Sequence, residues 1–119
     1  MKFICYPKCS TCLKAQNWLD ENKLSYELRD IKQNNPNYDE LKAWHEKSGL
    51  PLRNFFNTSG LLYKSLELKD KLPKMGDEEQ LRLLASDGML VKRPLFVGGD
   101  FVLVGFKQEQ WEQHFAKHG

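Results

Sequence analysis

Two cysteines, Cys9 and Cys12, stand three positions apart in the stretch Tyr6-Pro-Lys-Cys-Ser-Thr-Cys12. Such a pair can bind a metal, form a structural disulfide, fill the core or react reversibly with other thiols. A closed zinc site needs a fourth ligand, and the three histidines lie far along the chain without partner spacing. A permanent disulfide is rare in reducing compartments. A reactive pair is therefore the favoured interpretation, with no metal expected and inert burial as the plain alternative.

The residues around the pair predict the elements that position it. The apolar run 2–6 predicts a buried strand, apolar residues recur at helical spacing from Leu13 to about Asn22, and residues 24–28 alternate as a second strand would. A strand, a helix and a strand of these lengths predict a parallel βαβ unit. The cysteines then lie at its first strand-to-helix turn.

Cys9 is the predicted nucleophile because the start of a helix favours the thiolate over the thiol. The first-turn N–H groups have no intrahelical acceptor, and the helix dipole stabilises negative charge there. Lys8 is adjacent and adds positive charge. We expect Lys8, Ser10 and Thr11, which share this turn, to contact a substrate at Cys9.

The other two cysteines receive different predictions. Cys12 follows Cys9 by three residues, on the same helix face, so it is the predicted resolving thiol that closes a disulfide with Cys9. Cys5 lies inside the apolar strand, where burial blocks access, and is interpreted as core packing.

Lys92-Arg93-Pro94 predicts a second contribution to the site. Proline cannot donate to a strand ladder, so Pro94 belongs at the first residue of a strand, and we expect a cis peptide bond before it. Arg93 would then direct its guanidinium toward an anion or thiolate near Cys9. The alternative on local sequence is a solvated surface arginine.

The rest of the chain predicts a helical segment followed by a hairpin. Residues about 34–88 carry helical patterns: a capping box from Asn37 to Glu40, a helix from Leu61 to Leu72, and a second capping box from Asp77 to Gln80. Residues 94–97 and 101–104 flank Gly98-Gly-Asp100 and predict a β-hairpin before a final helix. The expectation is one α/β domain over 1–119 with a helical insertion.

Composition excludes several classes of function. The 119 residues carry a net charge of +2, which is too balanced for non-specific binding to nucleic acid or an anionic membrane. Apolar runs are too short for a membrane span, and the first residues do not form a signal peptide. We therefore expect a cytoplasmic monomer.

These motifs together resemble the arsenate-reductase-like family of the thioredoxin fold, which includes glutaredoxin-linked arsenate reductases and the transcription regulator Spx. The resemblance rests on Tyr6–Cys12, Gly49-Leu-Pro-Leu-Arg-Asn-Phe55, Lys92–Pro94 and Val104-Gly-Phe106. The Ser-Asp-Gly-Met-Leu stretch, residues 86–90, is similar to an uncharacterised cytoplasmic subgroup. The resemblance implies a four-stranded mixed sheet with a helical subdomain, Cys9 as nucleophile, and Arg53 and Arg93 as oxyanion ligands.

The chain also departs from the reductases of this family. The third oxyanion arginine would fall near Gly105, where this chain has no cation, and Leu13 stands where the family often has arginine. Cys12 replaces a serine that is usual in glutaredoxin-coupled enzymes, and a cysteine can close an internal disulfide. The prediction is therefore a thiol–disulfide oxidoreductase acting on a small thiol, an oxyanion or a protein disulfide. We expect no bound cofactor, because an external thiol donor such as glutathione or thioredoxin would supply the electrons.

The resemblance also implies a second function. The Spx branch shares the C-x-x-C pair and the Arg-Pro pair, and it binds the RNA polymerase alpha subunit through a surface with a glycine near the position of Gly49. A redox-sensitive regulator is therefore the alternative to an enzyme.

Overall fold

A four-stranded mixed sheet forms the centre of the computed structural model, which describes residues 1–118, with side chains up to Ala116. The strands β1 (Lys2–Cys5), β2 (Glu27–Asp30), β3 (Leu95–Val97) and β4 (Val102–Val104) lie in the order β2-β1-β3-β4. β1 and β2 are parallel, whereas β3 is antiparallel to both β1 and β4. The expected mixed sheet and the expected hairpin are confirmed, and the fold is thioredoxin-like.

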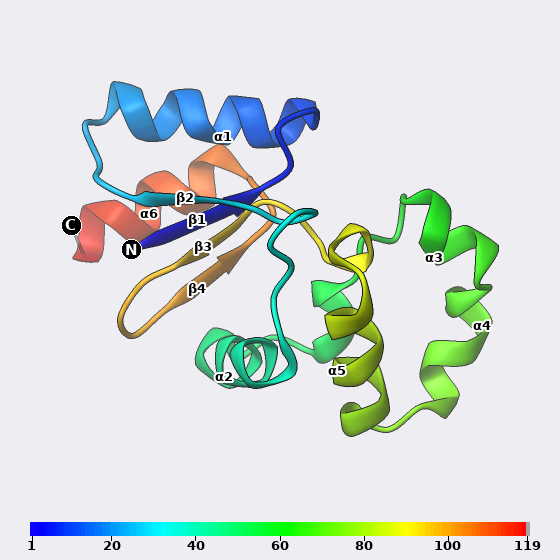
Figure 1. The fold of residues 1–119 in the computed structure, drawn as a ribbon. Coiled ribbons are helices and arrows are strands. Elements are labelled where there is room, and N and C mark those ends of the chain that lie inside the picture. The colour runs from blue at the N-terminus through cyan, green and yellow to red at the C-terminus, as the bar shows by residue number, and fades with distance from the viewer. Residues whose placement is uncertain (119) are drawn as a thin grey trace.

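Helices cover both faces of the sheet (Figure 1). Because side chains alternate along a strand, Phe3 and Cys5 point toward α1 (Ser10–Glu21) and α6 (Gln108–His118), whereas Ile4 points away from them. A cluster with Trp18 and Trp111 fills the first side. A larger cluster fills the second side, against α2 (Tyr38–Ser48) and the helices that follow it.

The residues between β2 and β3 form the helical segment beyond the end of the sheet in Figure 1. After α2 it comprises η1 (Leu52–Phe55), α3 (Leu61–Ser65), α4 (Leu68–Lys71), η2 (Leu72–Lys74), α5 (Asp77–Ser86) and η3 (Gly88–Leu90). The Asn37–Glu40 capping box is confirmed, and Gly49 ends α2 in the left-handed conformation, with φ of 68°.

Three local predictions were wrong in detail. The single helix expected over Leu61–Leu72 breaks at Glu67, whose φ of 54° is incompatible with helix continuation. The capping box expected at Asp77 does not form, because Gly76 is the N-cap and the Gln80 side chain donates to the Leu72 and Met75 carbonyls instead. The second strand starts at Glu27 and not at Leu24, because its register follows the pairing of Glu27 with Lys2.

The entry to and exit from the helical segment cross in close contact. A Cβ at Gly88 would lie 1.7 Å from the Ile31 carbonyl oxygen, so only glycine allows this approach. The Asn35 side chain donates to the Ala85 carbonyl at 2.8 Å across the same crossing. The two connections therefore hold the segment in one orientation relative to the sheet.

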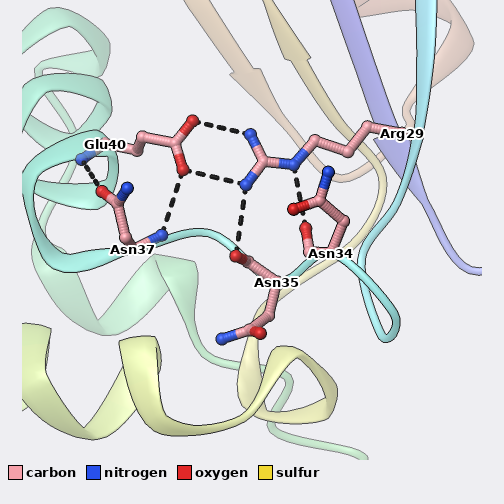
Figure 2. A network of polar contacts seen from close by, with 5 residues as sticks. All are labelled: Arg29, Asn34, Asn35, Asn37 and Glu40. Carbon is pink, nitrogen blue, oxygen red and sulfur yellow. Dashed lines mark hydrogen bonds and ion pairs between the residues drawn. The ribbon is translucent and has the colours of Figure 1, made fainter.

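A polar network fixes the entry connection from its other side (Figure 2). Arg29 of β2 forms a bidentate pair with Glu40 of α2, at 2.6 and 2.8 Å, and donates to the carbonyls of Asn34 and Asn35. Glu40 also accepts from the Asn37 backbone N–H. The Arg29 side chain thereby links β2 at the edge of the sheet to the connection at Asn34 and Asn35 and to α2.

Candidate active site

The Cys9 sulfur lies at a helix start, as the sequence predicts. Tyr6 to Cys9 form a turn closed by a 3.0 Å hydrogen bond from the Cys9 N–H to the Tyr6 carbonyl, and Pro7 occupies the position that favours proline in such turns. Cys9 is the N-cap of the 12-residue helix α1, and its side chain makes no capping hydrogen bond. It is partly exposed, so a partner can reach its sulfur.

Cys12 lies in the first turn of α1 and is almost completely buried, with 1% of its surface exposed, in a cluster against which Cys9 packs. The Cys12 sulfur accepts a hydrogen bond of 3.3 Å from the Tyr6 N–H, and the Cys12 thiol interacts electrostatically with those of Cys5 and Cys9. The hydrogen bond with Cys5, followed by burial, raises the pKa of the Cys12 thiol. All three cysteines are free thiols. Because its pKa is raised, Cys12 stays protonated, while Cys9 is the more accessible thiol of the pair.

Arg93 carries buried donors that find no acceptor. Its peptide bond to Pro94 is cis, as predicted. The guanidinium lies 5.2 Å from the centre of the Tyr6 ring, where it makes a cation–π contact. Nε and Nη1 are buried and donate no hydrogen bond within the described part of the chain. Buried donors are normally satisfied, so these unpaired N–H groups make Arg93 a candidate ligand for an anion.

A cleft of about 830 Å³ joins Cys9 and Arg93. It opens between the sheet and the helical segment, with Thr11 and Gly105 on the sheet side and Asn57 on the other. Its cations are Lys92, Arg93 and Lys107, and no Asp or Glu is among the described residues that line it; the remaining lining residues are Ser59, Gly60, Leu61, Leu62, Met89, Val104 and Phe106. The volume is that of a small-ligand site, and the charge selects anions.

The other predicted site residues are only partly brought together. Thr11 lies on the lip of the cleft, whereas Lys8 and Ser10 are exposed and do not line it. Arg53 is also exposed and lines an adjacent depression of about 420 Å³, which shares Lys92, Val104 and Lys107 with the main cleft. Arg53 and Arg93 therefore approach the same region from two hollows and do not line a single pocket.

Lys92 and Lys107 are the functional candidates that sequence reasoning missed. A Cβ at Gly105 would lie 3.3 Å from the Lys92 side chain. Lys92 therefore places a cation next to Gly105, the position near which the family's third arginine would fall. The Lys92 backbone is fixed by its N–H, which donates to the Phe55 carbonyl at 2.7 Å. Lys92 directly precedes Arg93 in the sequence, but adjacent residues usually point in different directions. Only the fold could show that both side chains line the same cleft.

Within the described residues, no three His, Cys, Asp or Glu side chains converge as metal ligands would. None of the described helices is long and apolar enough to cross a bilayer.

The profile of the ArsC family matches residues 5–114. The chain belongs to the ArsC family. Among curated relatives, the uncharacterised protein YusI of Bacillus subtilis is 53% identical over 98% of both chains, and the global transcriptional regulator Spx of Enterococcus faecalis is 27% identical over 87% of this chain and 77% of its own.

Solved structures of ArsC proteins have the same fold. An ArsC-family-related protein of Bacteroides fragilis superposes with a TM-score of 0.92 at 58% identity, covering 95% of this chain and 97% of its own. The arsenate reductase of Vibrio cholerae superposes with a TM-score of 0.81 at 25% identity, covering 95% and 97%. The family therefore contains both reductases and regulators, and the geometry of Cys9 and its cleft must decide between them.

Proposed function

We propose that this ArsC protein is a thiol–disulfide oxidoreductase whose substrate is a small anionic disulfide, with Cys9 as nucleophile and Cys12 as resolving thiol. One observation carries the proposal. The partly exposed Cys9 lines a cationic cleft, and a second thiol, Cys12, is buried in the cluster against which Cys9 packs.

Each step is an exchange of sulfur bonds. The Cys9 thiolate attacks one sulfur of the substrate disulfide, a mixed disulfide forms, and the first substrate half leaves as a thiolate that takes a proton from solvent. Cys12 then loses its proton and attacks Cys9, so the Cys9–Cys12 disulfide forms and the second half leaves. An external thiol returns the protein to its reduced state. Because that pool of thiols supplies the electrons, the chemistry belongs in a reducing cytoplasm and needs no bound cofactor.

The cleft favours a substrate with several carboxylates. Lys92, Arg93 and Lys107 present three cations, and the Arg93 guanidinium carries N–H groups that can donate charge-assisted hydrogen bonds to a carboxylate. Oxidised glutathione carries such groups around a central disulfide, and it is the probe that this charge pattern selects. Arsenate is less favoured, because Arg53 lies in the neighbouring hollow and Cys12 can resolve the adduct without a second thiol.

The test compares Cys12→Ser with the unmutated protein after exposure to oxidised glutathione. We expect the variant to retain one glutathionyl group on Cys9 by intact mass, because serine cannot resolve the adduct. The unmutated protein should release both halves and form an internal disulfide. The doubly substituted Cys9→Ser, Cys12→Ser protein is the matched control and should remain unmodified. An unmodified Cys12→Ser protein at neutral pH would refute the proposal.

A parallel assay with arsenate separates the two substrate classes. We expect the unmutated protein to reduce oxidised glutathione faster than arsenate when thioredoxin and its reductase supply electrons. Faster turnover of arsenate would assign the cleft to an oxyanion and overturn the choice of substrate.

The similarity to Spx favours a second function, a redox-gated regulator. In that case the Cys9–Cys12 disulfide would change the start of α1 and thereby a surface that binds the RNA polymerase alpha subunit. The test is retention of the alpha C-terminal domain by the reduced and by the oxidised protein. Retention in one redox state only would support the regulator, and no retention in either state would eliminate it.

A further inference from the structure

Cys5 lies on the same side of the sheet as the reactive pair. Alternation along β1 turns its side chain toward α1, and Cys12 points from the first turn of α1 into the same cluster. Only 4% of Cys5 and 1% of Cys12 is exposed. A cysteine that looks like simple core packing in the sequence is therefore a direct neighbour of the resolving thiol.

The three cysteine side chains pack together. Cys5 and Cys12 are buried in one cluster, Cys9 packs against that cluster, and Cys12 interacts electrostatically with both other thiols. The Tyr6 N–H holds the Cys12 sulfur in place at 3.3 Å. A hydrogen bond that Cys12 donates to Cys5 is consistent with the lowered pKa of the Cys5 thiol. The three side chains thus include a partly exposed one, Cys9, and two buried ones, of which Cys5 lies at the end of β1.

We propose that Cys5 is a third redox thiol, which exchanges with the Cys9–Cys12 disulfide and leaves a buried Cys5–Cys12 disulfide beside a reduced Cys9. The proposal rests on the function proposed above, because the Cys9–Cys12 disulfide is its starting point. Cys5 would then take part in the chemistry in addition to packing in the core.

The step is balanced without an added oxidant. Cys5 gives up its proton and attacks the Cys12 sulfur, so the Cys5–Cys12 bond forms while the Cys9–Cys12 bond breaks, and the departing Cys9 sulfur can take up a proton in exchange. Cys9 leaves as a thiolate, and the start of α1 stabilises its charge. One disulfide is consumed and one is formed. The oxidation is then stored where external thiols reach it poorly, and Cys9 is free to react with a second substrate.

The experiment follows the unmutated protein after one equivalent of oxidised glutathione. Samples are quenched in acid over time, free thiols are alkylated after unfolding, and disulfides are mapped by peptide mass. We expect the Cys9–Cys12 disulfide first and the Cys5–Cys12 disulfide later, with the alkylated residue changing from Cys5 to Cys9. A stable Cys9–Cys12 disulfide, with Cys5 alkylated at every time, would overturn the proposal while leaving the proposed function intact.

Three further variants test the direction of the relay. In Cys9→Ser the remaining thiols are both buried, so we expect the Cys5–Cys12 disulfide to form at least about tenfold more slowly than in the unmutated protein. Formation at an equal rate would show that Cys9 is not the entry point and would refute the relay. Cys5→Ala and the larger Cys5→Val, each checked for folding by circular dichroism, should both stop at Cys9–Cys12.

Discussion

Replacing Arg93 by methionine should leave the protein as stable as before, or more stable, while removing its affinity for anions. Methionine keeps the unbranched stem but carries no donor. The reason for the unusual sign is that Arg93 Nε and Nη1 are buried without an acceptor, so the unliganded protein already bears the cost of leaving them unpaired.

The magnitude follows from two opposing contributions. An unsatisfied buried donor costs about 1–3 kcal/mol, and Arg93 has two of them. The cation–π contact with Tyr6 returns about 0.5–2 kcal/mol, and the residue is half-buried, which reduces the cost of the unpaired donors. We therefore expect the free energy of unfolding of Arg93→Met to lie between the unmutated value and about 2 kcal/mol above it.

Arg29→Met is the matched control, because the same substitution there should have the opposite sign. Every nitrogen of the Arg29 guanidinium group donates to Glu40 or to a backbone carbonyl, and its side chain is only 13% exposed. Breaking this pair leaves the Glu40 carboxylate without its partner. A loss of about 2–4 kcal/mol is expected, somewhat below the value for a fully buried pair.

The assay is urea unfolding of the three proteins, with and without a high concentration of phosphate as the anion. Phosphate should stabilise the unmutated protein and Arg29→Met through the intact Arg93, but not Arg93→Met. If Arg93→Met lost as much stability as Arg29→Met, Arg93 would have a partner inside the protein and the argument for an anion site would fail. An equal gain from phosphate in all three proteins would likewise exclude Arg93 as the ligand.

Three further predictions concern the crossing, the polar network and the cleft. Gly88→Ala should lower the free energy of unfolding by about 3 kcal/mol or more by urea titration, because the new methyl group would overlap the Ile31 carbonyl; an effect below 1 kcal/mol would contradict the crossing. The hydrogen bonds from Arg29 hold the folded pKa of Glu40 below its ordinary value of about 4.5, so stability from this pair is present above that pH and is lost as the pH falls below it. In Glu40→Gln, the urea midpoint should therefore fall less steeply as the pH is lowered below about 4.5 than it does in the unmutated protein. An unchanged pH dependence would show that other carboxylates control the acid sensitivity. Lys92→Gln should raise the KM for oxidised glutathione about 3–10-fold with little change in kcat, while the exposed control Lys42→Gln should not; equal KM values would remove Lys92 from the site.

Much of the local structure could be predicted because it depends on neighbours in the chain. The strand-to-helix turn that holds Cys9 and the capping box at Asn37 each need only a few adjacent residues, and both form. The break at Glu67 and the late start of β2 could not be predicted in this way. The strand boundary depends on pairing with β1, a partner more than twenty residues away in the chain.

The sequence by itself indicated the candidate chemistry, from two cysteines at a strand-to-helix turn and an arginine before a cis proline, and it indicated the family. Only the tertiary structure decided which groups meet. Lys107 joins Lys92 and Arg93 because the antiparallel pairing of β3 with β4 places the residues before Leu95 beside those after Val104, whereas Arg53 of the helical segment lines a separate hollow. Cys5 becomes a neighbour of Cys12 because β1 lies under α1 with its odd-numbered side chains turned toward that helix. Such contacts depend on how distant elements pack, and residue spacing carries no information about that.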